Sequence, residues 1–170
     1  MISKRHLTRR PYCAALVPAA GKSERMGGTD KLTAQLGGIP VLERTLLALD
    51  GASLVDEMVR LGRQTYVAAP ALPVTDTVKV ADTAGLVQST PDRRTLFAVQ
   101  TPQVFQANIL KAALQSAIEA GAELTDDCSA VERLGKEVYL APGWRENIKI
   151  TTASDLTLAE ALLRERENRA

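Results

Sequence analysis

The chain has 170 residues, of which 45% are hydrophobic and 24% are charged, and this ordinary globular composition excludes a mainly disordered chain. Lys and Arg number 21 against 20 Asp and Glu, so no large field of one sign marks the whole chain for nucleic acid or an anionic membrane surface. The length favours a single domain over residues 1–170. Its core must be mainly aliphatic, because the chain holds only three Tyr, two Phe and one Trp.

The histidine and the cysteines narrow the chemistry further. His6 is the single histidine and lies in a basic amino-terminal tail, which argues against a hydrolase that uses histidine as its base. Cys13 and Cys128 belong to no CxxC pair, and we interpret both as free thiols. No apolar run approaches the ~18 residues of a membrane span, and no apolar segment follows the basic tail as in a secretory signal. We therefore expect a soluble, cytoplasmic protein.

The first predicted elements are a strand, a loop and a helix. Cys13–Val17 is a short continuous apolar run that ends at Pro18, which indicates a buried parallel strand. A loop rich in small residues follows it. Leu36–Pro40 has turn chemistry, and Pro40 is well placed at the first turn of a helix over Val41–Leu49.

The remaining sequence predicts further strands and helices in alternation, which favours an α/β sheet that is at least partly parallel. The predicted strands are Val55–Leu61, Tyr66–Val74, Leu96–Thr101, Val138–Ala141 and Ile148–Thr151. The predicted helices are Ala107–Ala120, Asp126–Leu134 and Asp155–Arg166. Thr77–Val80 and Leu86–Ser89 flank Asp82–Gly85 as a hairpin that we expect to project, because it is poor in large apolar side chains.

The loop after the first predicted strand suits a phosphate. Ala19, Ala20 and Gly21 place no bulk in the way of a ligand, so their backbone N–H groups can approach it closely. The loop satisfies neither GxGxxG nor GxxxxGK[ST]. Arg25 and Lys31 follow and could neutralise a triphosphate during phosphoryl or nucleotidyl transfer, although a solvated charged face has the same pattern.

Five blocks in order carry a resemblance to a known family. They are Ala15–Gly27 followed by Lys31, Pro73–Lys79, Thr101–Phe105, Thr125–Glu132 and Glu146–Thr151. The first resembles the signature loop of sugar-phosphate nucleotidyltransferases. Together they resemble the 2-C-methyl-D-erythritol 4-phosphate cytidylyltransferases of isoprenoid biosynthesis. The resemblance implies a Rossmann-like, mostly parallel sheet with a β-hairpin dimerisation arm at about residues 75–93.

The resemblance also implies an activity and a set of roles. Pro18, Ala19, Ala20 and Gly21 would line the CTP phosphates, with Arg25 and Lys31 at the triphosphate and Lys149 near the α-phosphate. Thr77, Arg93 and Thr101 would hold the sugar-alcohol phosphate, Arg93 being presented to the other subunit of a homodimer. A phosphate oxygen of the acceptor would displace pyrophosphate, with Mg²⁺ on the phosphates. The resemblance identifies no metal ligand in this chain.

Several of these residues also have a structural interpretation from the sequence alone. Arg93 can be a turn residue, Thr101 an ordinary strand end and Lys149 a surface lysine whose stem covers apolar neighbours. Asp126 and Asp127 begin a predicted helix, where an acidic residue caps the first turn and complements the helix dipole. We therefore leave the two aspartates out of the catalytic set.

The resemblance breaks between the first helix and Pro73. The family places there a second strand, a segment that helps to hold the cytidine and a His-Asp-Gly/Ala-Ala-Arg-Pro motif, whereas this chain has residues 59–66 in that place. A strand-helix-strand unit needs ~30 residues, so we expect that at least one is absent. Three explanations are open. The natural protein contains residues that this sequence omits, the chain was shortened deliberately, or the chain is a degenerate relative of the family. We favour the first explanation, because every surviving block keeps its key residue.

Two further functions remain open at this point. A close branch of the family transfers the cytidylyl group to ribitol 5-phosphate, so the acceptor can differ. Alternatively, the chain is a non-catalytic binding or dimerisation module that retains the arm and the loop.

Overall fold

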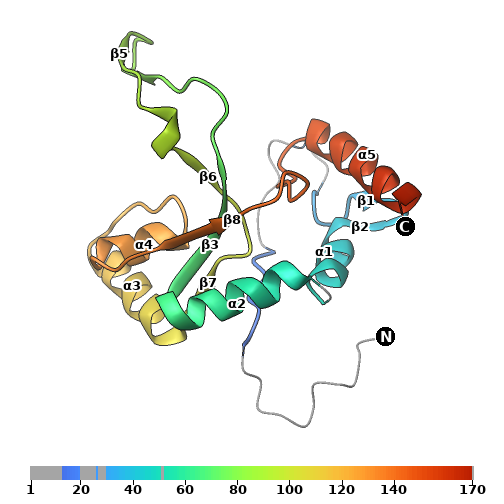
Figure 1. Cartoon of the computed structure of the whole chain (residues 1–170), viewed down its shortest axis with the longest axis horizontal. Coiled ribbons are helices and arrows are strands. Elements are labelled where there is room, and N and C mark those ends of the chain that lie inside the picture. The colour runs from blue at the N-terminus through green and yellow to red at the C-terminus, as the bar shows by residue number, and fades with distance from the viewer. Residues whose placement is uncertain (1–12, 20–25, 27–29, 51, 170) are drawn as a thin grey trace.

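The computed structural model describes residues 13–19, 26, 30–50 and 52–169 (Figure 1). The strands of these residues are β1 (Gln35–Leu36), β2 (Ile39–Pro40), β3 (Val67–Pro73), β4 (Val80–Ala81), β5 (Val87–Ser89), β6 (Phe97–Val99), β7 (Val104–Phe105) and β8 (Tyr139–Pro142). The helices are α1 (Val41–Leu49), α2 (Ser53–Thr65), α3 (Ala107–Glu119), α4 (Asp127–Arg133) and α5 (Ala153–Arg169), with a 3-10 turn, η3, at Arg93–Thr95.

Strand β3 is the centre of a four-stranded sheet. One of its edges pairs antiparallel with β7 near its start and with β6 near its end, while the other edge pairs parallel with β8. The predicted strand Leu96–Thr101 is confirmed as β6, which ends at Val99. Because β6 and β7 lie on the same edge of β3, residues 101–103 between them are outside the ladder and available for a site.

Helices cover both faces of this sheet, so it forms the middle layer of three (Figure 1). Val67 and Ala69 of β3 pack in one cluster with side chains of α3 and α4. Ala68 points the other way, into a cluster with Met58 of α2 and Ala141 of β8. Alanines on β3 let the helices approach closely, since each side chain occupies little volume. The predicted aliphatic core is confirmed, because the buried hydrophobic residues of the described chain include no aromatic.

Helix α2 replaces a strand that the sequence predicted at Val55–Leu61, and that prediction is wrong. Its apolar positions Val55, Met58 and Leu61 are three residues apart and fall on one helical face. Met58 is fully buried there. Gly62 lies against β7, where an added Cβ would come within 2.8 Å of the Val104 Cγ1 atom. The helical period therefore determines the fold of this segment.

The predicted strand at Cys13–Val17 is also wrong for the described residues, because this segment pairs with no strand and is exposed. The Leu16 side chain is 84% exposed. A strand needs a neighbour that completes its backbone hydrogen bonds, and the described sheet offers none to this segment. The expected mostly parallel sheet is therefore incorrect here, since two of the three ladders that β3 makes are antiparallel. Residues 148–151 likewise form no strand.

The predicted hairpin is present in a shorter form. Strands β4 and β5 pair antiparallel around a turn in which the Asp82 carboxylate accepts hydrogen bonds from the backbone N–H groups of Ala84 and Leu86. This hairpin, together with the two segments that connect it to the sheet, extends away from the sheet at the top of Figure 1. We call residues 75–93 the arm. The expectation that it projects is confirmed.

A smaller unit lies beside the sheet and contains β1, β2, α1 and α5 (Figure 1). Gly37 and Gly38 connect β1 to β2 with φ angles of 59° and 80°, a conformation that glycine adopts without strain. The Arg44 guanidinium of α1 donates hydrogen bonds to the carbonyls of Leu36 and Gly37. Helix α1 has the predicted bounds, and Pro40 stands directly before it.

The other predicted helices are confirmed with shifts of one to a few residues at their ends. Asp126 caps α4 in a capping box with Ser129, as an aspartate at this place predicts. The predicted strand at Val138–Ala141 is β8. Both cysteines are free thiols, as expected. In the described ranges, every helix is too short or too polar to cross a lipid bilayer.

Candidate active site

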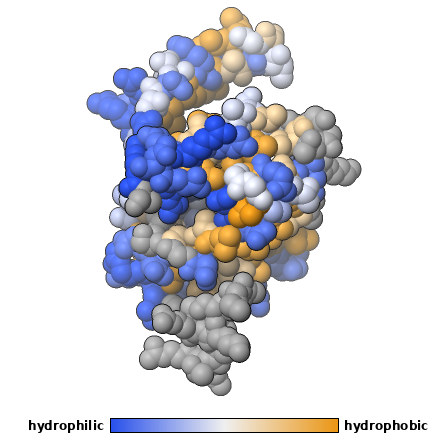
Figure 2. All heavy atoms as spheres, turned by 90° about the vertical axis from the view of Figure 1, so that its right-hand side faces the viewer, coloured by the Kyte–Doolittle hydropathy of each residue, from blue (hydrophilic) through white to orange (hydrophobic). Residues whose placement is uncertain are grey.

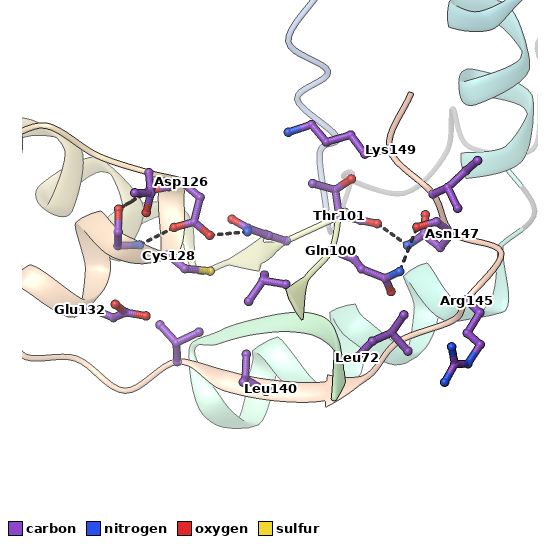
Figure 3. A pocket seen from close by; sticks show the side chains of 16 residues that line it. Leu72, Gln100, Thr101, Asp126, Cys128, Glu132, Leu140, Arg145, Asn147 and Lys149 are labelled. Carbon is purple, nitrogen blue, oxygen red and sulfur yellow. Dashed lines mark hydrogen bonds between the residues drawn. The ribbon is translucent and has the colours of Figure 1, made fainter. Parts of the chain in front are cut away.

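A cleft of about 730 Å³ opens where the gap between β6 and β7 meets the segment that follows β8. One wall comes from the end of β3 and from residues 99–103, the second from the start of α4, and the third from residues 145–149 (Figure 3). Three segments that are far apart in the sequence therefore meet at one place. Each contains part of a block that the sequence singled out, namely Thr101–Phe105, Thr125–Glu132 and Glu146–Thr151.

Thr101 and Lys149 line the same cleft, although 48 positions separate them in the chain numbering. Both side chains are exposed, so neither serves as core. The positive charge of Lys149 and the hydroxyl group of Thr101 are groups that bind phosphate oxygens. The structure brings together one residue predicted for the nucleotide and one predicted for the acceptor.

Amide side chains join the two segments that carry Thr101 and Lys149. The Asn147 Nδ2 atom donates a hydrogen bond of 2.7 Å to the Thr101 carbonyl. Gln100 Nε2 donates to the carbonyls of Trp144 at 2.8 Å and Asn147 at 2.9 Å, and Gln100 Oε1 accepts from the Trp144 N–H at 3.1 Å. Figure 3 shows part of this network.

The opposite end of the cleft is acidic. Gln103 Nε2 donates a 2.8 Å hydrogen bond to Asp126 Oδ2, while Asp126 Oδ1 accepts from the Ser129 N–H at 2.9 Å. One carboxylate oxygen of Asp126 thus holds the start of α4 against Gln103, while the other caps the helix. Asp126 is a cap, as the sequence indicated, and it also connects two walls of the cleft.

Cys128 lines the cleft but is suited to packing, not to nucleophilic chemistry. It is buried in one cluster with Val67 and Val131. Burial first, and then the nearby carboxylates of α4 and its cap, raise the pKa of the Cys128 thiol to about 12. Because the thiolate is the reactive form, this cysteine stays protonated and unreactive near neutral pH.

The chain leaves the cleft after Lys149 and enters α5 through a cap at Asp155. Asp155 Oδ2 accepts hydrogen bonds from the N–H groups of Thr151 and Thr152 at 2.9 and 2.8 Å, and from the Thr151 hydroxyl at 2.8 Å. These bonds, the backbone one from Thr151 above all, lower the pKa of Asp155 to about 2. The segment that carries Lys149 is therefore fixed at both ends, by Asn147 and by the cap.

Thr77 and Arg93 lie outside this cleft, at the base of the arm. Arg93 Nη1 donates a 3.1 Å hydrogen bond to the Thr75 carbonyl, which holds it beside the chain segment that contains Thr77. Both residues are exposed. The two predicted acceptor residues of the arm thus lie apart from Thr101, which belongs to the cleft.

Some residues predicted for the CTP phosphates lie outside the described part of the chain, namely Ala20, Gly21 and Arg25. Pro18 and Ala19 are described and are exposed. Lys31 lies in the turn before β1 and is partly buried. The described residues therefore test neither the phosphate loop nor its meeting with Lys149.

The sequence did not single out Gln100, Gln103, Asn147 or Arg145, although all four line the cleft. Amide side chains follow no hydrophobic period, so no pattern distinguishes them from surface residues. The available signal was position, because each lies within or next to a family block. Lys149 and Arg145 give one side of the cleft positive charge, so it can hold an anionic ligand such as a phosphate ester.

Comparisons with known proteins agree on one family. Residues 52–165 match the family described as 2-C-methyl-D-erythritol 4-phosphate cytidylyltransferase. A curated relative of that name from Desulforamulus reducens is 41% identical over 140 residues, which cover 82% of this chain and 56% of the relative. The crystal structure of 2-C-methyl-D-erythritol 4-phosphate cytidylyltransferase from Thermus thermophilus has a TM-score of 0.70 at 26% identity and covers 82% of this chain and 96% of that chain.

The comparisons also bear on length. The chain spans little more than half of the Desulforamulus reducens relative. A relative of the same name from Frankia casuarinae is 35% identical over 220 residues, which cover 90% of this chain and 82% of the relative. The aligned stretch is 220 positions long and contains about 153 residues of this chain, so the Frankia relative holds about 67 positions that have no counterpart here.

Proposed function

Because the chain belongs to the 2-C-methyl-D-erythritol 4-phosphate cytidylyltransferase family, we propose that it transfers a cytidylyl group from CTP to 2-C-methyl-D-erythritol 4-phosphate. The observation that carries this proposal is the cleft in which Thr101 and Lys149 meet. The products are pyrophosphate and 4-diphosphocytidyl-2-C-methyl-D-erythritol, a step of non-mevalonate isoprenoid biosynthesis. We place this activity in the cytoplasm.

The reaction needs charge neutralisation and alignment more than covalent chemistry. A phosphate oxygen of the acceptor forms a bond to the α-phosphorus of CTP, and the bond to the bridging oxygen breaks as pyrophosphate leaves. Lys149 neutralises charge at the α-phosphorus, while Arg25 and Lys31 hold the triphosphate near Pro18–Gly21. Thr101 holds the acceptor phosphate together with Thr77 and Arg93 of the arm.

Mg²⁺ belongs to this proposal as a companion of the nucleotide. The described residues contain no group of three or more His, Cys, Asp or Glu side chains that could hold a metal ion. Mg²⁺ commonly binds through substrate phosphates and one or two carboxylates. We therefore assign no metal ligand in this chain, and the roles given above are those of its own residues.

The arm supports a homodimer as part of the proposal. Its apolar side chains Val80, Leu86 and Val87 are 46%, 68% and 51% exposed, and Figure 2 shows apolar surface on this projecting segment. An isolated two-stranded hairpin is marginally stable in water. A second copy of the chain would cover these side chains and would receive Thr77 and Arg93 at its cleft.

We further propose that a segment of the family is absent between α1 and Pro73. The sequence placed the break at about residues 59–66. The family match begins at residue 52, and α2 runs without interruption over Ser53–Thr65, so both observations favour a break just before α2. The additional positions of the Frankia relative and the unpaired segment at Cys13–Val17 support the same proposal.

Pyrophosphate release tests the activity. We expect release only when CTP, methylerythritol phosphate and Mg²⁺ are all present. Lys149→Ala should lower kcat/KM by on the order of 100-fold or more, because a group that stabilises transition-state charge is lost. Lys111→Ala, at an exposed lysine of α3, is the matched control. Equal activity of the two variants would refute the role of Lys149.

The same assay separates the other functions. Preferential turnover of ribitol 5-phosphate would replace the acceptor but keep the chemistry. A non-catalytic module is favoured by the shortened length, and it predicts that the 170-residue chain dimerises without turnover and without binding CTP. Calorimetric titration with CTP decides that case, because tight binding contradicts the module.

A further inference from the structure

The Gln100 side chain lies between the two segments that carry Thr101 and Lys149. Its backbone N–H donates a 2.7 Å hydrogen bond to the Pro70 carbonyl, which fixes the residue to the central strand β3. Its amide group then makes three hydrogen bonds to the backbone of Trp144 and Asn147. One side chain thus supplies partners for two carbonyls and one N–H of the following loop.

The loop at residues 143–147 takes its shape mainly from contacts with other segments. It forms no regular element, and its internal backbone bond runs from the Asn147 N–H to the Trp144 carbonyl at 3.1 Å. The side chain of Trp144 is 58% exposed, so packing of the indole does not anchor the loop. The amide of Gln100 is therefore one of the contacts that orient the loop.

Gly143 makes this contact geometrically accessible. Its N–H donates a 2.9 Å hydrogen bond to the Ala71 carbonyl, which brings the loop directly onto β3. A Cβ atom at position 143 would overlap Gln100 Oε1 and would lie 3.1 Å from the Ala71 carbonyl group. Glycine at this position and the amide at position 100 therefore belong to one arrangement.

A second bond runs in the opposite direction between the same segments. Asn147 Nδ2 donates to the Thr101 carbonyl, next to Gln100 in the chain. Gln100 and Asn147 together fix the distance from residue 101 to the segment two residues before Lys149. Any loosening of this pair moves the Lys149 ammonium group relative to the Thr101 hydroxyl.

We propose that Gln100 is a positioning residue that sets the placement of Lys149 relative to Thr101, and hence of the nucleotide relative to the acceptor phosphate. This inference rests on the proposed cytidylyl transfer. In-line displacement is sensitive to alignment, since a misplacement of about 1 Å can cost roughly 100-fold in rate. Gln100 itself touches no reacting atom.

Two substitutions of Gln100 separate hydrogen bonding from the filling of space. Gln100→Leu removes all three bonds at similar volume. Gln100→Glu keeps an acceptor for the Trp144 N–H but, when ionised, cannot donate to the two carbonyls. Gln115→Leu, at an exposed glutamine of α3, is the matched control. Gly143→Ala provides an independent way to displace the Gln100 amide.

The measurements are steady-state pyrophosphate release and acrylamide quenching of Trp144, the one tryptophan of the chain. We expect kcat to fall about 10- to 100-fold in both Gln100 variants and in Gly143→Ala, with little change in the KM for CTP. Quenching of Trp144 should become faster in the same variants. Gln115→Leu should match the wild type in both measurements.

The outcomes are distinguishable. Wild-type kinetics in Gln100→Leu and Gln100→Glu, or a fall in kcat that vanishes when rates are divided by the folded fraction, overturns the positioning role alone. Faster quenching of Trp144 with an unchanged kcat also overturns the positioning role. A complete natural protein that releases no pyrophosphate refutes the proposed function, and the positioning role falls with it.

Discussion

At the scale of single residues, the carboxylate of Asp155 shows how a half-buried group stabilises the site from outside it. Oδ2 accepts three hydrogen bonds from Thr151 and Thr152, directly after the segment that carries Lys149. Helix α5 therefore begins at a fixed place relative to the cleft. The low pKa of Asp155, about 2, follows from these bonds, because they favour the ionised carboxylate.

This pKa predicts a pH dependence of stability. An unfolded aspartate titrates at about 3.9, so the stabilisation by Asp155 is complete above that pH and is lost as pH falls through about 2. We expect Asp155→Asn to lose less stability than the wild type between pH 4 and pH 2 in urea titrations. Asp50→Asn, at an exposed aspartate that follows α1, is the control. Parallel pH profiles for Asp155→Asn and the wild type would contradict the prediction.

At the scale of elements, α2 determines how one face of the sheet is covered. Met58 is fully buried against Ala68 and Ala141, and Gly62 allows the helix to lie close to β7. We expect Met58→Ala to lower the free energy of unfolding by about 2–5 kcal/mol, because the cavity cannot close against alanine neighbours. Urea denaturation measures this change. Leu47→Ala on the exposed face of α1 should have little effect, and equal midpoints for both variants would exclude the proposed packing.

The arm is the element whose role depends on a second chain. We expect the double variant Val80→Lys/Leu86→Lys to shift the sedimenting species from dimer to monomer, since charges at these exposed apolar positions would oppose burial. Leu47→Lys, at a residue of α1 that is 61% exposed, is the control outside the arm. A monomeric wild type, or a double variant that stays dimeric, would count against dimerisation through the arm.

The elements also show what sequence reasoning could and could not predict. Helix α1 was predicted with its bounds because Pro40 marks its start, and α4 was predicted to within one residue at each end, with an aspartate as its cap. The segment Val55–Leu61 was misread because a short apolar run fits a strand and a helix equally well. The strand prediction for Cys13–Val17 was wrong for another reason, since a strand depends on neighbouring strands that no local pattern contains.

Some residues of the candidate site could likewise be predicted from the sequence, and others could not. The family blocks indicated Thr101 and Lys149, and the structure places both in one cleft. They did not indicate Gln100 or Asn147, because the value of these amides lies in contacts between segments 44 to 47 positions apart. Such contacts exist only in the folded chain, and single-sequence patterns do not encode them.

At the scale of the whole molecule, two parts of the chain differ in how much of their apolar surface is covered. The sheet with α2, α3 and α4 has helices on both faces and contains both clusters of buried side chains. The part before α2 holds the short pair β1 and β2, helix α1 and an exposed apolar segment that includes Leu16. The contrast falls at the place where the family match begins, residue 52.

This contrast leads to a prediction about the natural protein. If this sequence lacks a segment just before α2 that the natural protein has, the intact mass of the natural protein lies well above 18.3 kDa. Trypsin should then release no peptide that joins Thr45 directly to Arg60, although the printed sequence has no Lys or Arg between those residues. Mass spectrometry of the protein purified from its source measures both quantities. The peptide ending at Arg44 and the peptide after Arg60 are internal controls for the digestion.

The opposite result would change the interpretation of the fold itself. A mass of 18.3 kDa together with an intact Thr45–Arg60 peptide would mean that the natural chain joins α1 to α2 directly. Cys13–Val17 would then have no strand to pair with among the described residues, and its apolar side chains would need another surface. The pyrophosphate assay would decide whether that shorter protein is still an enzyme, because it would contain every residue that lines the cleft with Thr101 and Lys149.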